Sequence, residues 1–291
     1  MKDYADFYGF SENPFNATPD LRFFFLPESR KGAFAYIVRG ISDRKGIILI
    51  LGEGGIGKTS LIQYLSDKLG EIIKAVTIDQ PDISGKNLVM EISLKVGLPS
   101  QNEPKGTLIH NLNEYLIKNY VDQGNFVIFV DEAHRLHKEA IEELRLFSNL
   151  ETGDEKLVQI VLFSQSEIVD KLNSKEFRQF KQRIAIRSEI RRLTEGESNQ
   201  YIEHRLKVVG SSSSEVFTQE AMSLICRYAK GIPRAINTIC DNCFRIGYDL
   251  STKPIGSSIV KRSQNNFFKK IFYRWLMLIR TGRNFFNTGN T

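Results

Sequence analysis

Eight consecutive residues limit the possible folds of this chain more than any other part of its sequence. Residues Gly52–Thr59 read GEGGIGKT and fit the pattern G-x-x-x-x-G-K-[ST] at every fixed position. In such a loop, glycines let backbone N–H groups point inward around phosphate oxygens, and the helix that follows adds a favourable dipole. The apolar run Ile47–Leu51 precedes the motif, and the helical pattern Thr59–Leu69 follows it. This strand, loop and helix context predicts a phosphate-binding loop.

The residue types of this loop predict a nucleoside triphosphate and Mg²⁺ as its ligands. Lys58 is expected to neutralise the β and γ phosphates, and Thr59 is expected to ligate the metal ion. We therefore expect ATP and Mg²⁺ as cofactors. The expected cofactor-binding residues of the loop are Gly52, Glu53, Gly54, Gly55, Ile56, Gly57, Lys58, Thr59 and Ser60.

A second apolar strand ends in two carboxylates. Val127–Val130 leads directly into Asp131 and Glu132. A Mg²⁺ ion beside a phosphate needs a carboxylate at the carboxyl end of a neighbouring strand, and Asp131 supplies one. Glu132 can orient and deprotonate the attacking water, so it is the expected catalytic base. The alternative is a strand that exits into an acidic helix cap. His134 and His137 would be metal-ligand candidates only if they shared a face with a third ligand, and their three-residue spacing alone is a weak signal, so we expect solvated histidines or histidines that support a neighbouring group.

Polar and basic residues downstream are further catalytic candidates. Ser164 and Gln165 follow a predicted strand, where a side chain can reach the γ-phosphate or the water, although Ser164 could instead be a plain helix N-cap. Arg178, Lys181 and Arg183 are interpreted as part of a basic helix. Arg183, or else Arg178, could act across a subunit boundary as an arginine finger, and the alternative is a solvated charged face.

Strand-like and helical patterns alternate up to Arg192, which favours an α/β fold with a parallel sheet covered by helices. The predicted strands are Ile47–Leu51, Ile72–Ile78, Phe126–Val130 and Leu157–Phe163, and the predicted helices between them are Thr59–Leu69, Ser84–Val96, Lys105–Asp122 and Lys138–Leu150. The predicted later helices are Glu195–Val209, Thr218–Lys230 and Pro233–Tyr248. We expect a nucleotide-binding domain over 1–192 that includes an aromatic, proline-rich N-terminal segment, a small all-helical lid domain over 193–260, and a tail over 261–291.

The tail carries the whole charge excess of the chain, whose net charge is +6. Its basic residues are Lys261, Arg262, Lys269, Lys270, Arg274, Arg280 and Arg283, and it contains no acidic ones. Over Phe267–Arg280, helical spacing puts Trp275 and large apolar residues opposite the cations. Such a helix suits an anionic membrane surface, and the alternatives are docking on its own protein, nucleic acid or a protein groove.

The remaining composition favours a reducing, cytoplasmic location. The 291 residues include three cysteines, no signal peptide opens the chain, and no apolar run is long enough to cross a bilayer. Cys240 and Cys243 have the CxxC spacing of a redox or zinc site, but they lie within a helical apolar period. We expect them to pack in a core.

Several spaced motifs resemble the AAA+ ATPases of the general secretion pathway protein A family, which are related to the TnsC and TniB transposition ATPases. Beside the phosphate loop and the sequence DEAH at 131–134, the motifs are Tyr8-Gly9-Phe10, Asn13-Pro14-Phe15, Thr18-Pro19-Asp20, Gln182-Arg183-Ile184, Tyr201-Ile202, Arg205-Leu206, Phe217-Thr218 and Gly231-Ile232-Pro233-Arg234 with Ile236-Asn237. The resemblance implies an AAA+ fold with a helical lid. It also implies that Pro14 and Phe15 lie near the adenine, that Ser164 or Gln165 is sensor 1 and that Arg234 is sensor 2.

The resemblance further implies a homo-oligomer, either a ring or an open helix, in which one subunit completes its neighbour's site. Secretion members of this family continue into a transmembrane helix and a periplasmic part, and this chain ends at Thr291 with neither. We expect an ATPase that couples Mg-ATP hydrolysis to assembly with a membrane-associated secretion or surface-polymer export machine, in the cytoplasm or peripherally on the inner membrane. The alternatives are a DNA-associated ATPase for transposition target selection and a nucleotide-dependent scaffold with little turnover.

Overall fold

The computed structural model describes residues 4–264, except 17, 19, 71, 72, 123 and 154. The chain divides into two compact units. Pro19–Arg192 forms the first, here called the sheet unit. The second, here called the helical unit, combines the N-terminal segment up to Thr18 with the chain from Leu193 onward. Among the described residues, no helix is both long and apolar enough to cross a membrane.

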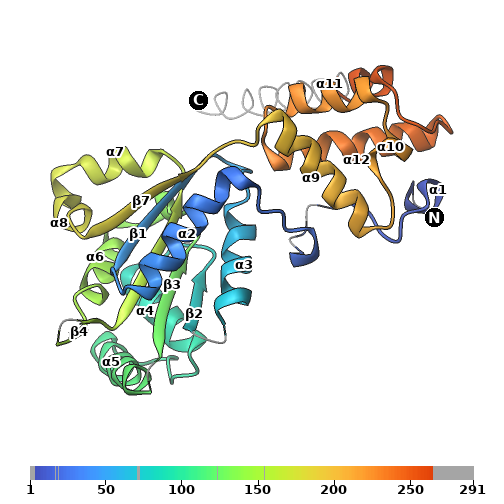
Figure 1. Ribbon diagram of the computed structural model, residues 1–291. Helices are drawn as coiled ribbons and strands as arrows, with labels where there is room; N and C mark the ends of the chain where they lie inside the picture. The colour runs from blue at the N-terminus through green and yellow to red at the C-terminus, as the bar shows by residue number, and fades with distance from the viewer. Residues whose placement is uncertain are drawn as a thin grey trace, which may run out of the picture. The chain divides into compact units, whose positions relative to one another are not determined.

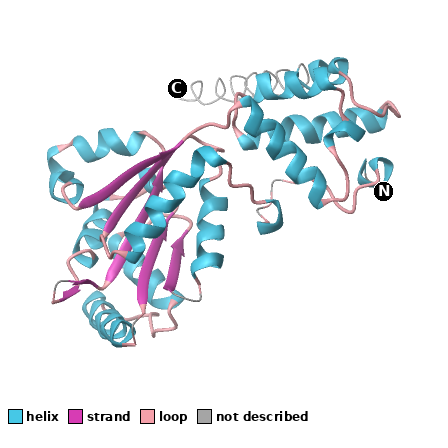
Figure 2. Cartoon of the chain, viewed as in Figure 1, coloured by secondary structure: helices cyan, strands magenta, loops and turns pink. Residues whose placement is uncertain are grey.

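The sheet unit is built on five parallel strands in the order β2-β3-β6-β1-β7 (Figure 2). These strands are β1 (Ile47–Gly52), β2 (Ile73–Ile78), β3 (Asn125–Val130), β6 (Val158–Ser164) and β7 (Ile184–Ile190), and a small antiparallel pair is formed by β4 (Glu151–Thr152) and β5 (Glu155–Lys156). Every residue of β1, β3 and β6 is buried, because helices cover both faces of the sheet. The predicted α/β fold with a parallel sheet is therefore confirmed.

Helices lie on both sides of this sheet (Figure 1). One face packs against α2 (Glu28–Ser42) and α3 (Lys58–Leu69). The other face packs against α4 (Gly85–Lys95), α5 (Lys105–Val121), α6 (Lys138–Phe147), α7 (Glu167–Asn173) and α8 (Arg178–Lys181). Three short 3₁₀ turns complete the unit: η1 (Leu21–Phe23), η2 (Ala133–Arg135) and η3 (Lys175–Phe177).

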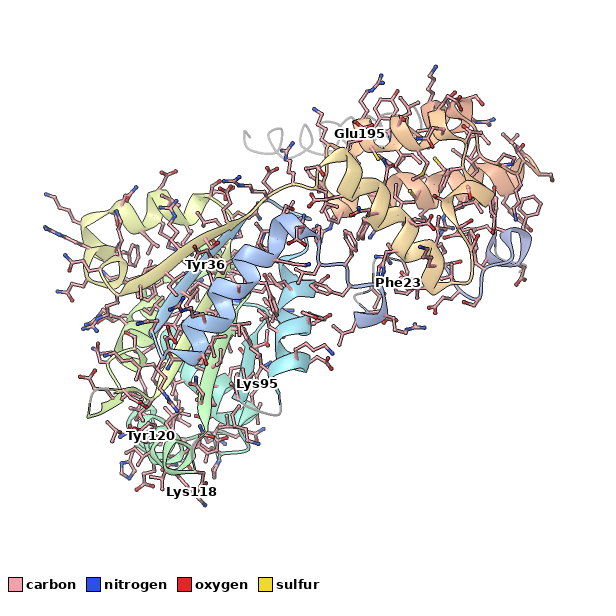
Figure 3. The ribbon with its side chains drawn as sticks, in the orientation of Figure 1. Phe23, Tyr36, Lys95, Lys118, Tyr120 and Glu195 are labelled. Carbon is pink, nitrogen blue, oxygen red and sulfur yellow. The ribbon has the colours of Figure 1, made fainter. Side chains whose placement is uncertain are left out.

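Among the elements of the sheet unit that were not predicted, α2 and β7 pack together. A Cβ added at Gly40 of α2 would lie 2.6 Å from Ile186 and 2.7 Å from Ile48, so the helix backbone touches the strands directly. Tyr36, on the outer side of α2, is 61% exposed (Figure 3). β7 escapes prediction because it is an edge strand with alternating exposed residues such as Arg187 rather than a continuous apolar run.

The helical unit contains α1 (Tyr4–Tyr8), α9 (Glu195–Val208), α10 (Ser213–Val216), α11 (Gln219–Ala229) and α12 (Pro233–Asp249), and residues 257–264 are also helical. Local sequence explains where its helices begin. Thr194 and Glu197 form a capping box before α9, Thr218 caps α11, and Pro233 occupies the first turn of α12. The expected helices after Arg192 therefore form.

The N-terminal aromatic segment requires a correction. The sequence analysis placed it in the nucleotide-binding domain, but residues up to Thr18 belong to the helical unit. The reason is apolar packing, because the rings of Tyr8, Phe10 and Phe15 all pack around Phe244 of α12 with ring centroids 4.9 to 5.9 Å apart. The predicted amphipathic tail helix Phe267–Arg280 lies outside the described residues.

Candidate nucleotide-binding site

The phosphate loop connects the end of β1 to the start of α3. Gly57, the last residue before the helix, has a φ of +104°, a conformation that residues with a side chain rarely adopt. α3 begins at Lys58, so the unpaired N–H groups of its first turn face the loop. Its helix dipole favours negative charge there. The predicted loop residues Gly52–Ser60 thus form a loop that enters a helix N-terminus, where an anion is favoured.

Lys58 is a buried cation with exchangeable partners. Its residue is 4% exposed, and its Nζ donates to the carbonyl oxygens of Gly52 and Glu53 at 3.0 and 3.2 Å. The same Nζ lies 3.5 Å from Oε1 of Glu132. A buried ammonium with only carbonyl groups and one carboxylate around it gains most from a stronger anion. Phosphate oxygens entering the loop would supply that anion.

Thr59 and Asp131 present two oxygen ligands beside the loop. The Thr59 hydroxyl donates a hydrogen bond of 2.5 Å to Oδ2 of Asp131. Asp131, which directly follows β3, is 5% exposed, and its Oδ1 accepts from the backbone N–H of Glu132 at 2.8 Å. A hydroxyl and a carboxylate held this close are the hard oxygen donors that Mg²⁺ takes, so the predicted metal ligands fit that ion.

Glu132 is held at the centre of the site by three side chains. Its backbone lies in the left-handed region, with φ 48°, and its Oε2 accepts from Nε2 of Gln165 at 3.1 Å. Nε2 of His134 lies 3.5 Å from the same oxygen. Burial raises the pKa of Glu132, but the Gln165 hydrogen bond and the charges of Lys58 and His134 outweigh it and hold that pKa below its ordinary value. The carboxylate is therefore ionised at neutral pH and can accept a proton.

The structure distinguishes the two predicted sensor residues. Ser164 is fully buried at the end of β6, and its hydroxyl donates to the backbone carbonyl of Gln165 at 3.0 Å. The Gln165 side chain instead extends toward the loop, because its Oε1 lies 3.5 Å from the position of a Cβ added at Gly54. Gln165 therefore contacts Glu132 and approaches the phosphate loop, whereas Ser164 supports the backbone behind it.

Comparison with known proteins now identifies this arrangement. Residues 41–172, which contain both carboxylates and the phosphate loop, match the AAA domain family. The chain is 34% identical over 239 residues to General secretion pathway protein A of Aeromonas hydrophila, a match that covers 82% of this chain and 44% of that protein. Residues 41–172 therefore form an AAA domain. The chain's predicted resemblance to the general secretion pathway protein A family is confirmed, and the chain spans less than half of that relative's length.

Solved AAA+ structures share the fold at low sequence identity. The ADP form of Aeropyrum pernix ORC2 superposes with a TM-score of 0.66 at 16% identity, covering 87% of this chain and 72% of that one. For Pyrobaculum aerophilum Cdc6p the TM-score is 0.64 at 14% identity, with coverages of 86% and 71%. For the Thermotoga maritima RuvB branch migration motor it is 0.56 at 16% identity, with coverages of 84% and 70%. The predicted AAA+ fold is confirmed.

Arg30 is a residue of this AAA+ site that sequence reasoning missed. It lies on α2, and its Nη1 donates to the carbonyl oxygen of Ile56 within the phosphate loop at 2.9 Å. Its Nε donates to the carbonyl of Arg191 at 3.2 Å. Arg30 therefore ties the loop backbone to the end of β7. Neither α2 nor β7 was predicted, so no local signal connected Arg30 with the loop.

The predicted arginine fingers lie at the opposite end of the sheet. Arg178 begins α8 and is exposed, as predicted for a basic helix. Arg183 needs a correction, because α8 ends at Lys181 and Arg183 stands in the turn before β7. Ile184 pairs with Ile47, five residues before the end of β1, which places the start of β7 about 17 Å from the loop.

Three other predicted nucleotide contacts lie in the helical unit. The carbonyl oxygen of Pro14 accepts from Nε of Arg205 at 2.5 Å, and Phe15 is 3% exposed with its ring on Phe244. Arg234 is exposed in the first turn of α12. Their roles at the adenine and as sensor 2 remain predictions.

The cysteines of the CxxC sequence are core residues. Cys240 and Cys243 are both fully buried, and burial raises the pKa of the Cys243 thiol to about 12. In the described part of the chain, no group of three or more His, Cys, Asp or Glu residues lies together as a metal site would need. The prediction of core packing for this pair is confirmed.

Proposed function

We propose that this protein binds Mg-ATP at the phosphate loop and hydrolyses it to ADP and phosphate. One observation carries the proposal, namely the connected network of Lys58, Glu132 and Gln165 beside the Thr59–Asp131 pair. Each of these side chains has the chemistry that one step of phosphoryl transfer needs. A nucleotide-dependent scaffold with little turnover would have no need for an ionised Glu132 facing the loop.

The chain's own residues divide the work of hydrolysis. Lys58 exchanges its carbonyl partners for phosphate oxygens and neutralises their charge. Glu132 accepts the proton of the attacking water, while Gln165 fixes the direction of its carboxylate. Thr59 and Asp131 would hold Mg²⁺, which would neutralise part of the negative charge that develops on the phosphate groups during hydrolysis.

The test separates binding from hydrolysis. We expect Glu132→Gln to bind ATP within about twofold of the unmodified protein and to hydrolyse it at least about 10²-fold more slowly, because the loop is intact and only the base is lost. Phosphate release and equilibrium binding of Mg-ATP measure the two quantities. The matched control is Glu139→Gln, which removes an exposed carboxylate of α6 outside the network. Equal rates of ATP hydrolysis by Glu132→Gln and the unmodified protein would contradict the assignment of Glu132 as the catalytic base.

We further propose that the protein works as a homo-oligomer, a ring or an open helix, in which Arg183 acts on the neighbouring subunit. Arg178 is the second choice. Arg183 lies at the far end of β1 from its own phosphate loop, so the two cannot meet within one chain. Its exposure leaves it available to a second copy. An arginine finger supplied in this way stabilises the charge of the transferring phosphate.

Mixing two inactive variants tests this arrangement. Arg183→Ala should bind ATP normally and hydrolyse it poorly, since its own loop is intact. Lys58→Ala lacks a working loop but still carries Arg183. A mixture of the two should recover hydrolysis, because hybrid interfaces pair an intact loop with an intact arginine. No recovery at any ratio, together with a monomeric protein in ATP, would reject the oligomer.

The partner proposed for this ATPase is a membrane-associated secretion or surface-polymer export machine at the cytoplasmic face of the inner membrane. The support is the relative from Aeromonas hydrophila, whose name places it in a general secretion pathway. DNA is the second candidate, because Aeropyrum pernix ORC1 was solved in complex with DNA and has the same fold. We expect the hydrolysis rate to rise with vesicles of anionic lipid and not with duplex DNA. The reverse result would favour the DNA-associated reading.

A further inference from the structure

The segment that ends β7 lies directly beside the phosphate loop. Ile190 pairs with Gly52, and a Cβ added at Gly52 would lie 3.4 Å from the Cβ of Ile190. Arg30 bonds both the loop and the carbonyl of Arg191. The strand pairing and the two Arg30 hydrogen bonds hold the backbone before Arg192 beside the loop, so the Arg192 side chain can reach the loop.

Arg192 forms a two-pronged ion pair with the loop residue Glu53. Its Nε donates to Oε1 at 2.7 Å, and its Nη2 donates to Oε2 at 2.6 Å. This is the fork geometry in which a guanidinium holds a carboxylate most specifically. The hydrogen bond from Arg192 lowers the pKa of Glu53 and in turn raises the pKa of Arg192. Glu53 is therefore a paired anion at neutral pH.

Stability alone does not explain this pair. The side chains of Arg192 and Glu53 are 44% and 52% exposed. Ion pairs this exposed contribute little to folding, because water already solvates both charges well. Glu53, however, is the second residue of the loop, and its own backbone carbonyl accepts from Lys58. A negative charge at this position repels any polyphosphate that the loop binds.

We propose that Arg192 is a positioning residue that neutralises Glu53 and thereby sets the affinity of the loop for nucleoside polyphosphates. The inference rests on the proposed nucleotide function and adds a residue to it. Arg192 acts through Glu53, by cancelling its charge and holding its carboxylate in one direction. Without Arg192, the loop would present an unpaired carboxylate to a ligand that carries several negative charges.

Four proteins test the proposal: the unmodified chain, Arg192→Ala, Glu53→Gln and the double variant. The equilibrium dissociation constant of Mg-ATP is measured for each by calorimetry. Arg192→Ala should bind about five- to tenfold more weakly, since an unpaired charge a few ångströms from the phosphates is only partly screened. Glu53→Gln should bind no more weakly than the unmodified protein. The double variant should match Glu53→Gln within about twofold, because no carboxylate then needs an arginine.

Two further measurements separate charge from structure. The defect of Arg192→Ala should shrink as sodium chloride rises from about 0.05 M to about 0.5 M, because salt screens the exposed carboxylate. Arg191→Ala is the matched control, since it removes the same charge one residue earlier from an exposed side chain. It should bind Mg-ATP like the unmodified protein.

Several results would overturn the proposal. Arg192→Ala could bind as tightly as the unmodified chain, or Glu53→Gln could weaken binding as much as Arg192→Ala with no recovery in the double variant. The second pattern would make the pair a structural clasp of the loop. Failure of the unmodified chain to bind Mg-ATP would instead overturn the nucleotide assignment itself, and this inference with it.

Discussion

Among the described residues, each unit of this protein buries one cation, and the two cations are held differently. Lys58 of the sheet unit is 4% exposed and donates to two loop carbonyls, with Glu132 nearby. Arg205 of the helical unit is 6% exposed and donates to the carbonyls of Pro14 and Asn16 and to the hydroxyl of Tyr201. The Arg205 guanidinium also lies 5.7 Å from the ring centroid of Phe15. Both charges have left water, so both must be compensated.

The difference teaches how a buried charge can be assigned a role. Lys58 stands at a loop before a helix N-terminus, where an entering anion can displace its carbonyl partners. Arg205 of α9 lies over the ring of Phe15 and bonds the carbonyls on either side of that residue, and its five donors suit several fixed acceptors. Lys58 is therefore assigned to ligand binding, and Arg205 to the folding of the N-terminal segment onto α9.

Removing the Lys58 charge should give the largest effect. We expect Lys58→Ala to weaken Mg-ATP binding about 10³-fold, which equals about 4 kcal/mol, because the phosphates lose their buried cation. Thermal unfolding should change little, because removing Lys58 also removes the cost of burying its charge. Calorimetry and circular dichroism measure the two effects. Lys68→Ala, an exposed cation on the same helix, is the control and should bind normally. Tight binding of Mg-ATP by Lys58→Ala would show that the buried Lys58 cation does not serve ligand binding.

Replacing the Arg205 cation should act on stability instead. We expect Arg205→Met to lower the free energy of unfolding by about 3 kcal/mol, because the buried carbonyl of Pro14 loses its donor and the partly buried hydrogen bond to the carbonyl of Asn16 is lost as well. Urea unfolding followed by circular dichroism measures this loss. Arg245 offers a matched control, since it also lies over an aromatic ring, Tyr4, and bonds Asp241, but is 59% exposed.

The stability losses of the Arg205 and Arg245 variants test whether burial determines how much an arginine contributes to folding. Arg245→Met should cost less than about 1 kcal/mol, because solvent already screens its ion pair. Equal losses from both variants would mean that burial does not distinguish them. A loss of ATP binding in Arg205→Met without a loss of stability would move Arg205 from the structural to the functional class.

The fold was predictable where burial is complete on both sides. β1, β3 and β6 are buried, largely apolar runs, and each was found from its sequence although Gln159 lies within β6. β7 was missed because its exposed positions carry residues such as Arg187 and Glu189, which break the apolar pattern. The N-terminal segment was predicted in the wrong unit, because its partner Phe244 lies far along the chain and no local pattern points to it.

The site was predictable to the same extent. Lys58, Asp131 and Glu132 were found because phosphate and metal chemistry fixes both their types and their places after buried strands. Arg30 and Arg192 were not, because their contacts depend on how α2 and β7 pack beside the loop. Tertiary packing rather than local sequence determines such residues.

Close packing in the helical unit gives the next prediction. Gly247 lies within α12, and a Cβ added there would lie 2.1 Å from the Tyr8 hydroxyl oxygen. Glycine to alanine ordinarily stabilises a helix by about 1 kcal/mol. Here we expect Gly247→Ala to destabilise by about 2 kcal/mol, because Tyr8 is buried and cannot move aside. Urea unfolding tests the sign.

A double variant isolates the clash. Tyr8→Phe removes the oxygen that the new methyl group would meet, together with its hydrogen bond to the carbonyl of Thr252. The double variant should therefore be more stable than the sum of the two single losses predicts. Strict additivity would show that the hydroxyl does not limit packing at this position.

The smallest expected effect concerns Gln165, which aligns a charged group rather than supplying one. We expect Gln165→Ala to slow ATP hydrolysis about tenfold and to leave the dissociation constant of Mg-ATP within about twofold, because one hydrogen bond to the Glu132 carboxylate is lost while Lys58 stays in place. Ser164→Ala is the companion variant, since that hydroxyl only bonds the backbone behind Gln165. If Ser164→Ala slows hydrolysis more than Gln165→Ala, the sensor role belongs to Ser164. If Gln165→Ala weakens binding and leaves the rate unchanged, Gln165 supports the phosphate loop rather than Glu132. Its role in the sheet unit would then be structural, like that of Arg205 in the helical unit.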